Sequence, residues 1–153
     1  MYKKERYIME EVIKNLNEFL CDLEVMNVKL QNYHWNVQGK GFFITHEKLE
    51  EYYDEIRVQI DEIAEHILSL GYQPLGTMQD FIKNSQLQEA KNERIKSLPV
   101  IHNVIEDLRA MRNKVTQIKE HAEENKDYGT SSLMDNYLAN YSKKLWMLNE
   151  TIK

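Results

Sequence analysis

The chain has 153 residues, of which 42% are hydrophobic and 29% charged, and this composition predicts one globular domain spanning residues 1–153. Five Gly and two Pro are too few for the many turns of a β-sandwich or barrel. No apolar run approaches the roughly 20 residues of a membrane span, and the first residues do not form the apolar segment of a signal peptide. A single cysteine excludes a disulfide within the chain. We therefore expect a cytoplasmic protein without a membrane partner, and the net charge of −5 favours cations over nucleic acid.

Four segments of the chain repeat apolar residues at alternating steps of three and four, which is the signature of an amphipathic helix. They run from Leu16 to His34, from His46 to Leu70, from Ile101 to Ala122 and from Met134 to Ile152. No segment shows the sustained alternation of a strand. The pattern predicts an all-α protein of four long helices, each with one buried face.

Breaks between these segments predict how the helices are connected. Short breaks at residues 39–41 and 127–131 join antiparallel neighbours, whereas the stretch from Gly71 to Pro99 is much longer. One short helix is expected within that stretch, at Met78, Phe81 and Ile82. Ser97 is expected to cap the third long helix, with Pro99 in its first turn. The sequence thus predicts a ferritin-like four-helix bundle with a long crossover between helices two and three that carries a short extra helix.

Two histidines occupy positions on the predicted apolar faces where leucine would be expected. His34 ends the first apolar stripe and His46 begins the second. One interpretation is a pair of hydrogen-bonded core residues; the other is a metal site, because neutral imidazole is the commonest metal ligand. Glu50 lies one turn after His46, and Asp61 and Glu65 form a second pair one turn apart further along the same helix.

Helix geometry limits how these groups combine. His46 and Asp61 are 15 residues apart, or about 22 Å along a helix, so the two pairs cannot share one metal within a chain. They are symmetric about Glu55 and Ile56, and two copies of this helix crossing antiparallel near Tyr52, Glu55 and Ile56 would bring each pair to its counterpart. No histidine has Glu three residues before it, which argues against a di-iron centre inside one bundle. The pattern favours a metal site between subunits.

Three stretches of the sequence form a specific pattern: they read LQNYHWNVQG over residues 30–39, FFITHEKLEEYYD over 42–54 and DEIAEHILSLG over 61–71. This pattern resembles the Dps family, the mini-ferritins. The resemblance implies a hollow homododecamer with ferroxidase sites, each for two irons, at its dimer interfaces. Its catalytic and metal-binding residues would be His34, His46 and Glu50 of one subunit with Asp61 and Glu65 of its neighbour. Glu50 stands where the family commonly has Asp, and Trp35 matches a tryptophan near the iron, where it either packs or transfers electrons.

The same resemblance implies an enzyme that oxidises Fe(II), preferably with hydrogen peroxide, and stores the ferric mineral inside the shell during oxidative stress. The alternative is a nucleoid protein that condenses DNA and binds iron incidentally. A third reading is a structural shell with a degenerate metal site. Only Lys3, Lys4 and Arg6 precede the expected first helix, so the Lys-rich tail of DNA-coating members is absent and we expect no direct DNA binding.

Other residues could have secondary roles. His66, beside Glu65, is expected either to support the iron site or to lie on the surface. Cys21 is expected to be packed. The acids near the start of the last helix either line an entry pore for iron or form an ordinary solvated turn; they are Glu123, Glu124, Asp127 and Asp135.

Overall fold

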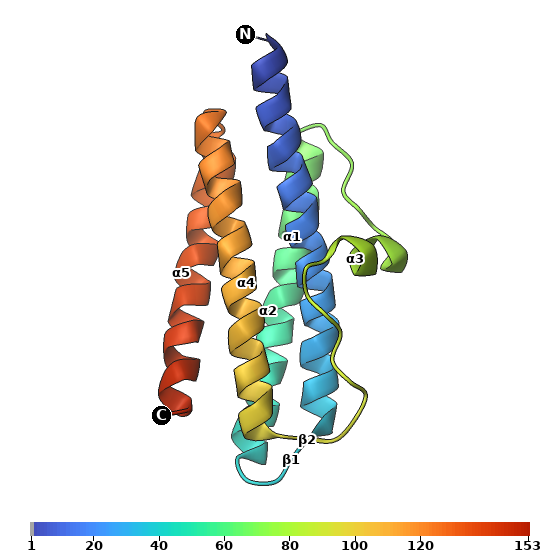
Figure 1. Ribbon diagram of the computed structural model, residues 1–153, viewed down its shortest axis with the longest axis vertical. Helices are drawn as coiled ribbons and strands as arrows, with labels where there is room; N and C mark the ends of the chain where they lie inside the picture. The colour runs from blue at the N-terminus through green and yellow to red at the C-terminus, as the bar shows by residue number, and fades with distance from the viewer. Residues whose placement is uncertain (1) are drawn as a thin grey trace.

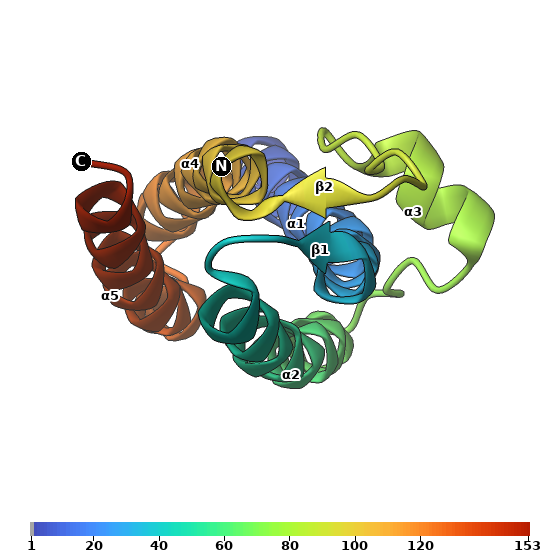
Figure 2. The ribbon, with the colours of Figure 1, turned by 90° about the horizontal axis from the view of Figure 1, so that it is seen from below.

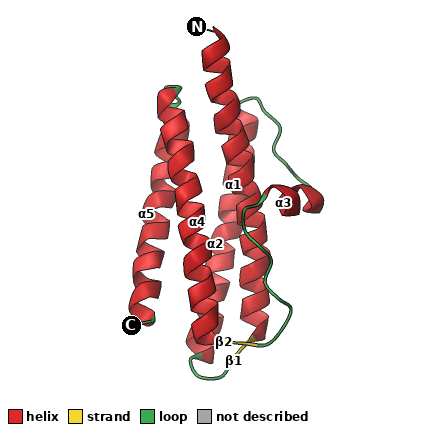
Figure 3. Cartoon of the chain, viewed as in Figure 1, coloured by secondary structure: helices red, strands yellow, loops and turns green. Residues whose placement is uncertain are grey.

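The structure is a computed structural model that describes residues 2–153, with only the backbone for residues 2, 5 and 8. Four long helices run side by side (Figures 1 and 3). These are α1 (Tyr2–Asn36), α2 (Phe42–Ser69), α4 (Ser97–Glu124) and α5 (Tyr128–Thr151), and the short α3 (Met78–Asn84) lies in the crossover between α2 and α4. The predicted all-α bundle with one extra helix in a long crossover is confirmed.

The apolar stripes of the four long helices meet in one core. Leu16, Leu23 and Leu30 of α1 are almost fully buried, as are Ile63 of α2 and Met111 of α4. Each such side chain contributes about 1.5–3 kcal/mol when removed from water. Burial of these stripes, rather than helix propensity alone, holds helices of this length together.

The crossover decides the direction of the helices. α1 and α2 are antiparallel and so are α4 and α5, whereas α2 and α4 run the same way and begin at the same end of the bundle (Figures 1 and 2). The turn between α1 and α2 uses Gly39 and Gly41, with φ of 88° and 81°, a region that side chains other than glycine enter at a cost. A two-residue strand after α1, β1 (Val37–Gln38), pairs in parallel with β2 (Ile95–Lys96) just before α4. Strands this short have no periodicity, so the sequence did not predict them.

A buried carboxylate fastens the crossover to α1. Asp22 accepts hydrogen bonds from Ser85 Oγ at 2.8 Å, from the backbone N–H of Gln86 at 2.9 Å and from Gln86 Nε2 at 2.7 Å. Burial raises the pKa of the Asp22 carboxyl, an effect that these three donors oppose. The short helix α3 is capped by Thr77, whose side chain accepts from the Asp80 N–H.

Two helix starts differ from the sequence-based expectation. The helix α4 begins at Ser97 itself, with Lys96 as N-cap, and the Ser97 hydroxyl is buried without a hydrogen-bond partner among the described residues, so the predicted cap is wrong. Pro99 lies in the first turn as predicted. The helix α1 begins at Tyr2, so Lys3, Lys4 and Arg6 lie within it rather than in a tail before it. Its first turns project beyond the other helices (Figure 1).

In the described part of the chain, every helix is too short or too polar to span a bilayer.

Candidate metal centre

The α1–α2 turn brings the two predicted histidine ligands into contact. His34 lies in the last turn of α1 and His46 in the first turns of α2. Their rings stack with centroids 3.7 Å apart and planes 13° from parallel. Tyr53 meets the His34 ring edge-on and Phe42 stacks on His46, so packing fixes both rings.

Reciprocal hydrogen bonds determine which nitrogen of each ring is available. His34 Nδ1 lies 2.7 Å from the carbonyl oxygen of His46, and His46 Nδ1 lies 2.8 Å from the carbonyl oxygen of His34. Because a carbonyl oxygen only accepts, each Nδ1 must carry a proton, and in the neutral ring Nε2 then holds the free lone pair. Such a bond from the second ring nitrogen is the usual device that orients a metal-binding imidazole. Neither Nε2 has a hydrogen bond to a described residue.

The three predicted carboxylate ligands lie on one exposed side of α2. Glu50 and Asp61 are separated by three helical turns, and Glu65 follows one turn after Asp61. The acids of α2 that face α5 are engaged, since Glu55 pairs with Lys144 and Glu62 accepts from the Tyr137 hydroxyl. By contrast, the structure gives Glu50, Asp61 and Glu65 no ion pair with any described residue.

One chain does not gather these side chains into a complete site. Within residues 2–153, no group of three or more His, Cys, Asp or Glu side chains lies close enough to hold a metal ion. The structure brings His34 and His46 together and leaves Asp61 and Glu65 several turns away on the same helix.

Two of the three residues expected at the centre of the dimer contact are buried in their own chain, and the place of the contact stays a prediction. Tyr52 and Ile56 are buried in their own bundle, and Glu55 accepts hydrogen bonds from Lys144 and Asn140 of α5. These residues face the core and α5 because the helical period turns them away from the side that carries Glu50 and Asp61. Near the midpoint of α2, Val58 instead has an exposed side chain.

Trp35 is the exposed neighbour of His34. Its side chain is 66% exposed, so it does not pack inside its own chain. The packing interpretation is therefore wrong for the single subunit, and a role in electron transfer stays a prediction.

Most of the acids proposed for a pore form hydrogen bonds or ion pairs at the turn between α4 and α5. Asp127 caps α5 by accepting from the Thr130 N–H at 3.1 Å and from the Thr130 hydroxyl at 2.5 Å. Thr130 Oγ1 in turn lies 2.7 Å from His66 Nε2, which ties α2 to α5. His66 is thus a structural residue, a role that sequence reasoning missed because its partner is 64 residues away.

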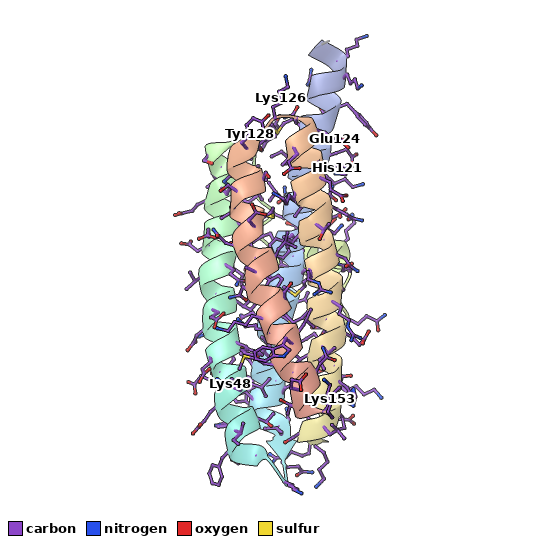
Figure 4. All side chains as sticks on the ribbon, turned by 90° about the vertical axis from the view of Figure 1, so that its left-hand side faces the viewer. Lys48, His121, Glu124, Lys126, Tyr128 and Lys153 are labelled. Carbon is purple, nitrogen blue, oxygen red and sulfur yellow. The ribbon has the colours of Figure 1, made fainter. Side chains whose placement is uncertain are left out.

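Two further acids near this turn are held by Lys119. Glu123 and Asp135 lie 2.9 and 3.0 Å from its ammonium group. Hydrogen bonds from Lys119 and Ser131 lower the pKa of Glu123. Figure 4 shows Glu124 at the same end of the bundle, near Lys126 and Tyr128. A pore role for this group stays a prediction.

Cys21 is packed, as predicted. Its thiol is fully buried and donates to the carbonyl oxygen of Asp80 at 3.6 Å. Burial raises the pKa of the Cys21 thiol to about 12, with nearby acids adding to the effect. It has neither the exposure nor the thiolate character of a metal ligand.

Known proteins are similar to this chain in both fold and sequence. Residues 13–153 match the family described as ferritin-like domain. The structure of antigen TpF1 from Treponema pallidum superposes with a TM-score of 0.94 at 31% identity, covering 96% of this chain and 94% of that one. A Dps protein from Vibrio cholerae, described as a member of a broad superfamily of ferritin-like diiron-carboxylate proteins, gives 0.92 at 33% identity, with coverage of 96% and 92%. The family match and the fold define a ferritin-like protein.

Proteins with similar sequences show which family of ferritin-like proteins the chain belongs to. DNA protection during starvation protein 2 from Bacillus anthracis is 36% identical over 91% of this chain and 94% of its own length. A DNA protection during starvation protein from Helicobacter pylori is 32% identical over 90% and 94%. The chain belongs to the Dps family.

Proposed function

We propose that this protein is a ferroxidase that oxidises Fe(II) with hydrogen peroxide at sites shared between two subunits and stores the ferric product inside a hollow homododecamer. The observation that carries the proposal is the pair His34 and His46, whose reciprocal Nδ1 bonds leave both Nε2 atoms free and held in place. A merely structural pair of histidines would not need two unpartnered nitrogens on stacked rings.

The donor set suits iron as the substrate. His34, His46 and Glu50 would come from one subunit, and Asp61 and Glu65 from the other. Imidazole and carboxylate together accept Fe(II), and the carboxylates favour the Fe(III) product because they offset its extra charge. Two Fe(II) ions supply two electrons, and with two protons these reduce one hydrogen peroxide to two waters. Paired oxidation therefore releases no hydroxyl radical.

A second copy of the chain is the partner that would complete the site. The side of α2 that carries the carboxylates also exposes Val58, which is 67% exposed. The helices α1 and α3 also expose Val28, Met78 and Ile82 around one groove. Exposed apolar groups beside unpaired acids mark an interface rather than a solvated surface. A two-fold axis would make that interface self-complementary, as the symmetric spacing of the ligands requires.

An anaerobic Fe(II) titration tests the proposal. We expect saturable binding of about two Fe(II) per subunit, followed by consumption of one peroxide for every two Fe(II) when peroxide is added. Light scattering should report a dodecamer. A stable monomer, or iron oxidation that is no faster than in protein-free buffer, would refute the proposal.

A further inference from the structure

Two long helices begin side by side without a side-chain cap. The helices α2 and α4 are parallel, and the β1–β2 pairing holds their first residues together at the same end of the bundle (Figure 2). The N-caps are Gly41 and Lys96; neither makes a side-chain cap bond, and neither helix has an acid in its first turn. The helices α3 and α5, by contrast, are capped by Thr77 and Asp127. The pair of uncapped ends concentrates the positive poles of two helix dipoles.

A buried hydroxyl points at this junction and has no partner. Ser97, the first residue of α4, is only 8% exposed, and its Oγ makes no hydrogen bond to a described residue. A Cβ atom placed on Gly41 would lie 3.5 Å from that Oγ, so the hydroxyl faces the N-cap of α2 at the point where glycine has no side chain. A buried polar group without a partner costs free energy, which an acceptor at this point would relieve.

Several other polar groups around the junction can donate, and the buried hydroxyl of Thr45, 3.9 Å from the same Cβ position on Gly41, can donate as well as accept. The N–H groups of Phe43 and Ile44 in the first turn of α2 have no acceptor in the described part of the chain. The side chain of Lys96 lies over Gly39, and its Nζ is 3.1 Å from the position that a Cβ atom on Gly39 would take. Lys40 is exposed in the same turn, and neither lysine has an ion pair with a described residue.

We infer that this junction binds a phosphate-class oxyanion. A tetrahedral dianion offers enough acceptor oxygens for the Ser97 hydroxyl, the first-turn N–H groups of α2 and an ammonium group at once. A carboxylate has only two oxygens and would leave part of this donor set unpaired. The ligand is inorganic phosphate, because a phosphodiester of a nucleic-acid backbone has only two terminal oxygens, as few as a carboxylate, and carries a single charge. The inference does not rest on the iron site, because none of its donor groups belongs to a proposed iron ligand.

Calorimetric titration of the assembled, iron-free protein with inorganic phosphate tests this assignment. Ionic strength is held constant with sodium chloride, because phosphate also stabilises proteins through exclusion from their surface. We expect saturable binding that Lys96→Gln weakens by about tenfold or more, since a charge-assisted hydrogen bond is lost. Ser97→Ala should weaken binding while leaving the phosphate-free protein equally or more stable, because it removes an unpartnered hydroxyl. The control is Lys143→Gln, which removes the same charge at an exposed position of α5. This variant should bind phosphate as the wild type does.

A short DNA duplex without terminal phosphates tests this choice of ligand. We expect the duplex to leave the binding of inorganic phosphate unchanged. Duplex that displaces inorganic phosphate from the wild type, and that Lys96→Gln does not bind, would contradict the assignment to a dianion. The assignment is overturned if phosphate shows no saturable binding, or if Lys143→Gln loses as much affinity as Lys96→Gln.

Discussion

Complementation between two inactive variants tests whether the iron site is shared. His46→Ala removes a ligand from one half of the proposed site, and Asp61→Ala removes one from the other half. Each homo-oligomer should retain roughly a tenth or less of the wild-type rate. Replacing a residue that only hydrogen-bonds to a metal ligand already lowers metal affinity or activity about tenfold or more, and here a ligand itself is lost. In a mixed dimer, one site carries both substitutions and the other carries neither.

The expected recovery follows from the symmetry of the dimer. When the two variants are unfolded together in equal amounts and reassembled, about half of the dimers are mixed and each has one intact site, so about a quarter of all sites should be active. The matched control combines His46→Ala with Glu50→Ala. Both residues lie in the same half of the site, so mixing these variants leaves no intact site.

Both substitutions should be compatible with folding. Asp61 is exposed and has no ion pair with a described residue, so its loss affects the bundle little. His46→Ala removes the ring stacked on His34 and the bond to its carbonyl, at a cost of about 1–3 kcal/mol. The assay is the initial rate of peroxide-driven Fe(II) oxidation, and circular dichroism checks the fold. Mixed assemblies that form but show no more activity than their parents would refute a shared site, and His34 and His46 would then be core residues.

Two further predictions concern stability. Burial raises the pKa of the Asp22 carboxyl in the folded protein, so the native state binds the carboxyl proton more tightly than the unfolded chain does. The contribution of Asp22 to the free energy of unfolding therefore falls as the pH rises from the pKa of Asp22 in the unfolded chain through its higher pKa in the folded protein. In urea denaturation, the stability of the wild type relative to Asp22→Asn should therefore decrease over that pH range, and a difference that does not change with pH would contradict this effect of burial. Thr130→Val should destabilise the protein by about 1–3 kcal/mol, because it leaves His66 Nε2 without its partner and removes the hydroxyl bond to Asp127, while Thr130→Ser should restore most of the loss. Equal stability of the valine and serine variants would contradict the structural role of His66.

The sequence by itself determined the helices, because helix formation and the period of 3.6 residues are local properties. The stripe from Leu16 to His34 appears in the structure as one buried face, and the short helix at Met78–Asn84 was readable from its spacing alone. The positions of His34 and His46 were also readable, since a polar ligand on an apolar stripe stands out against its neighbours. Chain distance alone already excluded a site shared by His46 and Asp61 within one subunit.

Only the tertiary structure decided what each side chain faces. The exposed side of α2 depends on where α5 packs, and for that reason Tyr52 and Ile56 belong to the core. The free Nε2 atoms follow from two hydrogen bonds across a turn, and the roles of Asp22 and His66 follow from partners more than 60 residues away. The β1–β2 pairing that places the start of α2 beside that of α4 joins residues 37 and 95, again beyond the reach of any local pattern. Hydrogen bonds and packing between distant segments depend on how whole helices are placed, and a helical period fixes only which face of one helix is apolar.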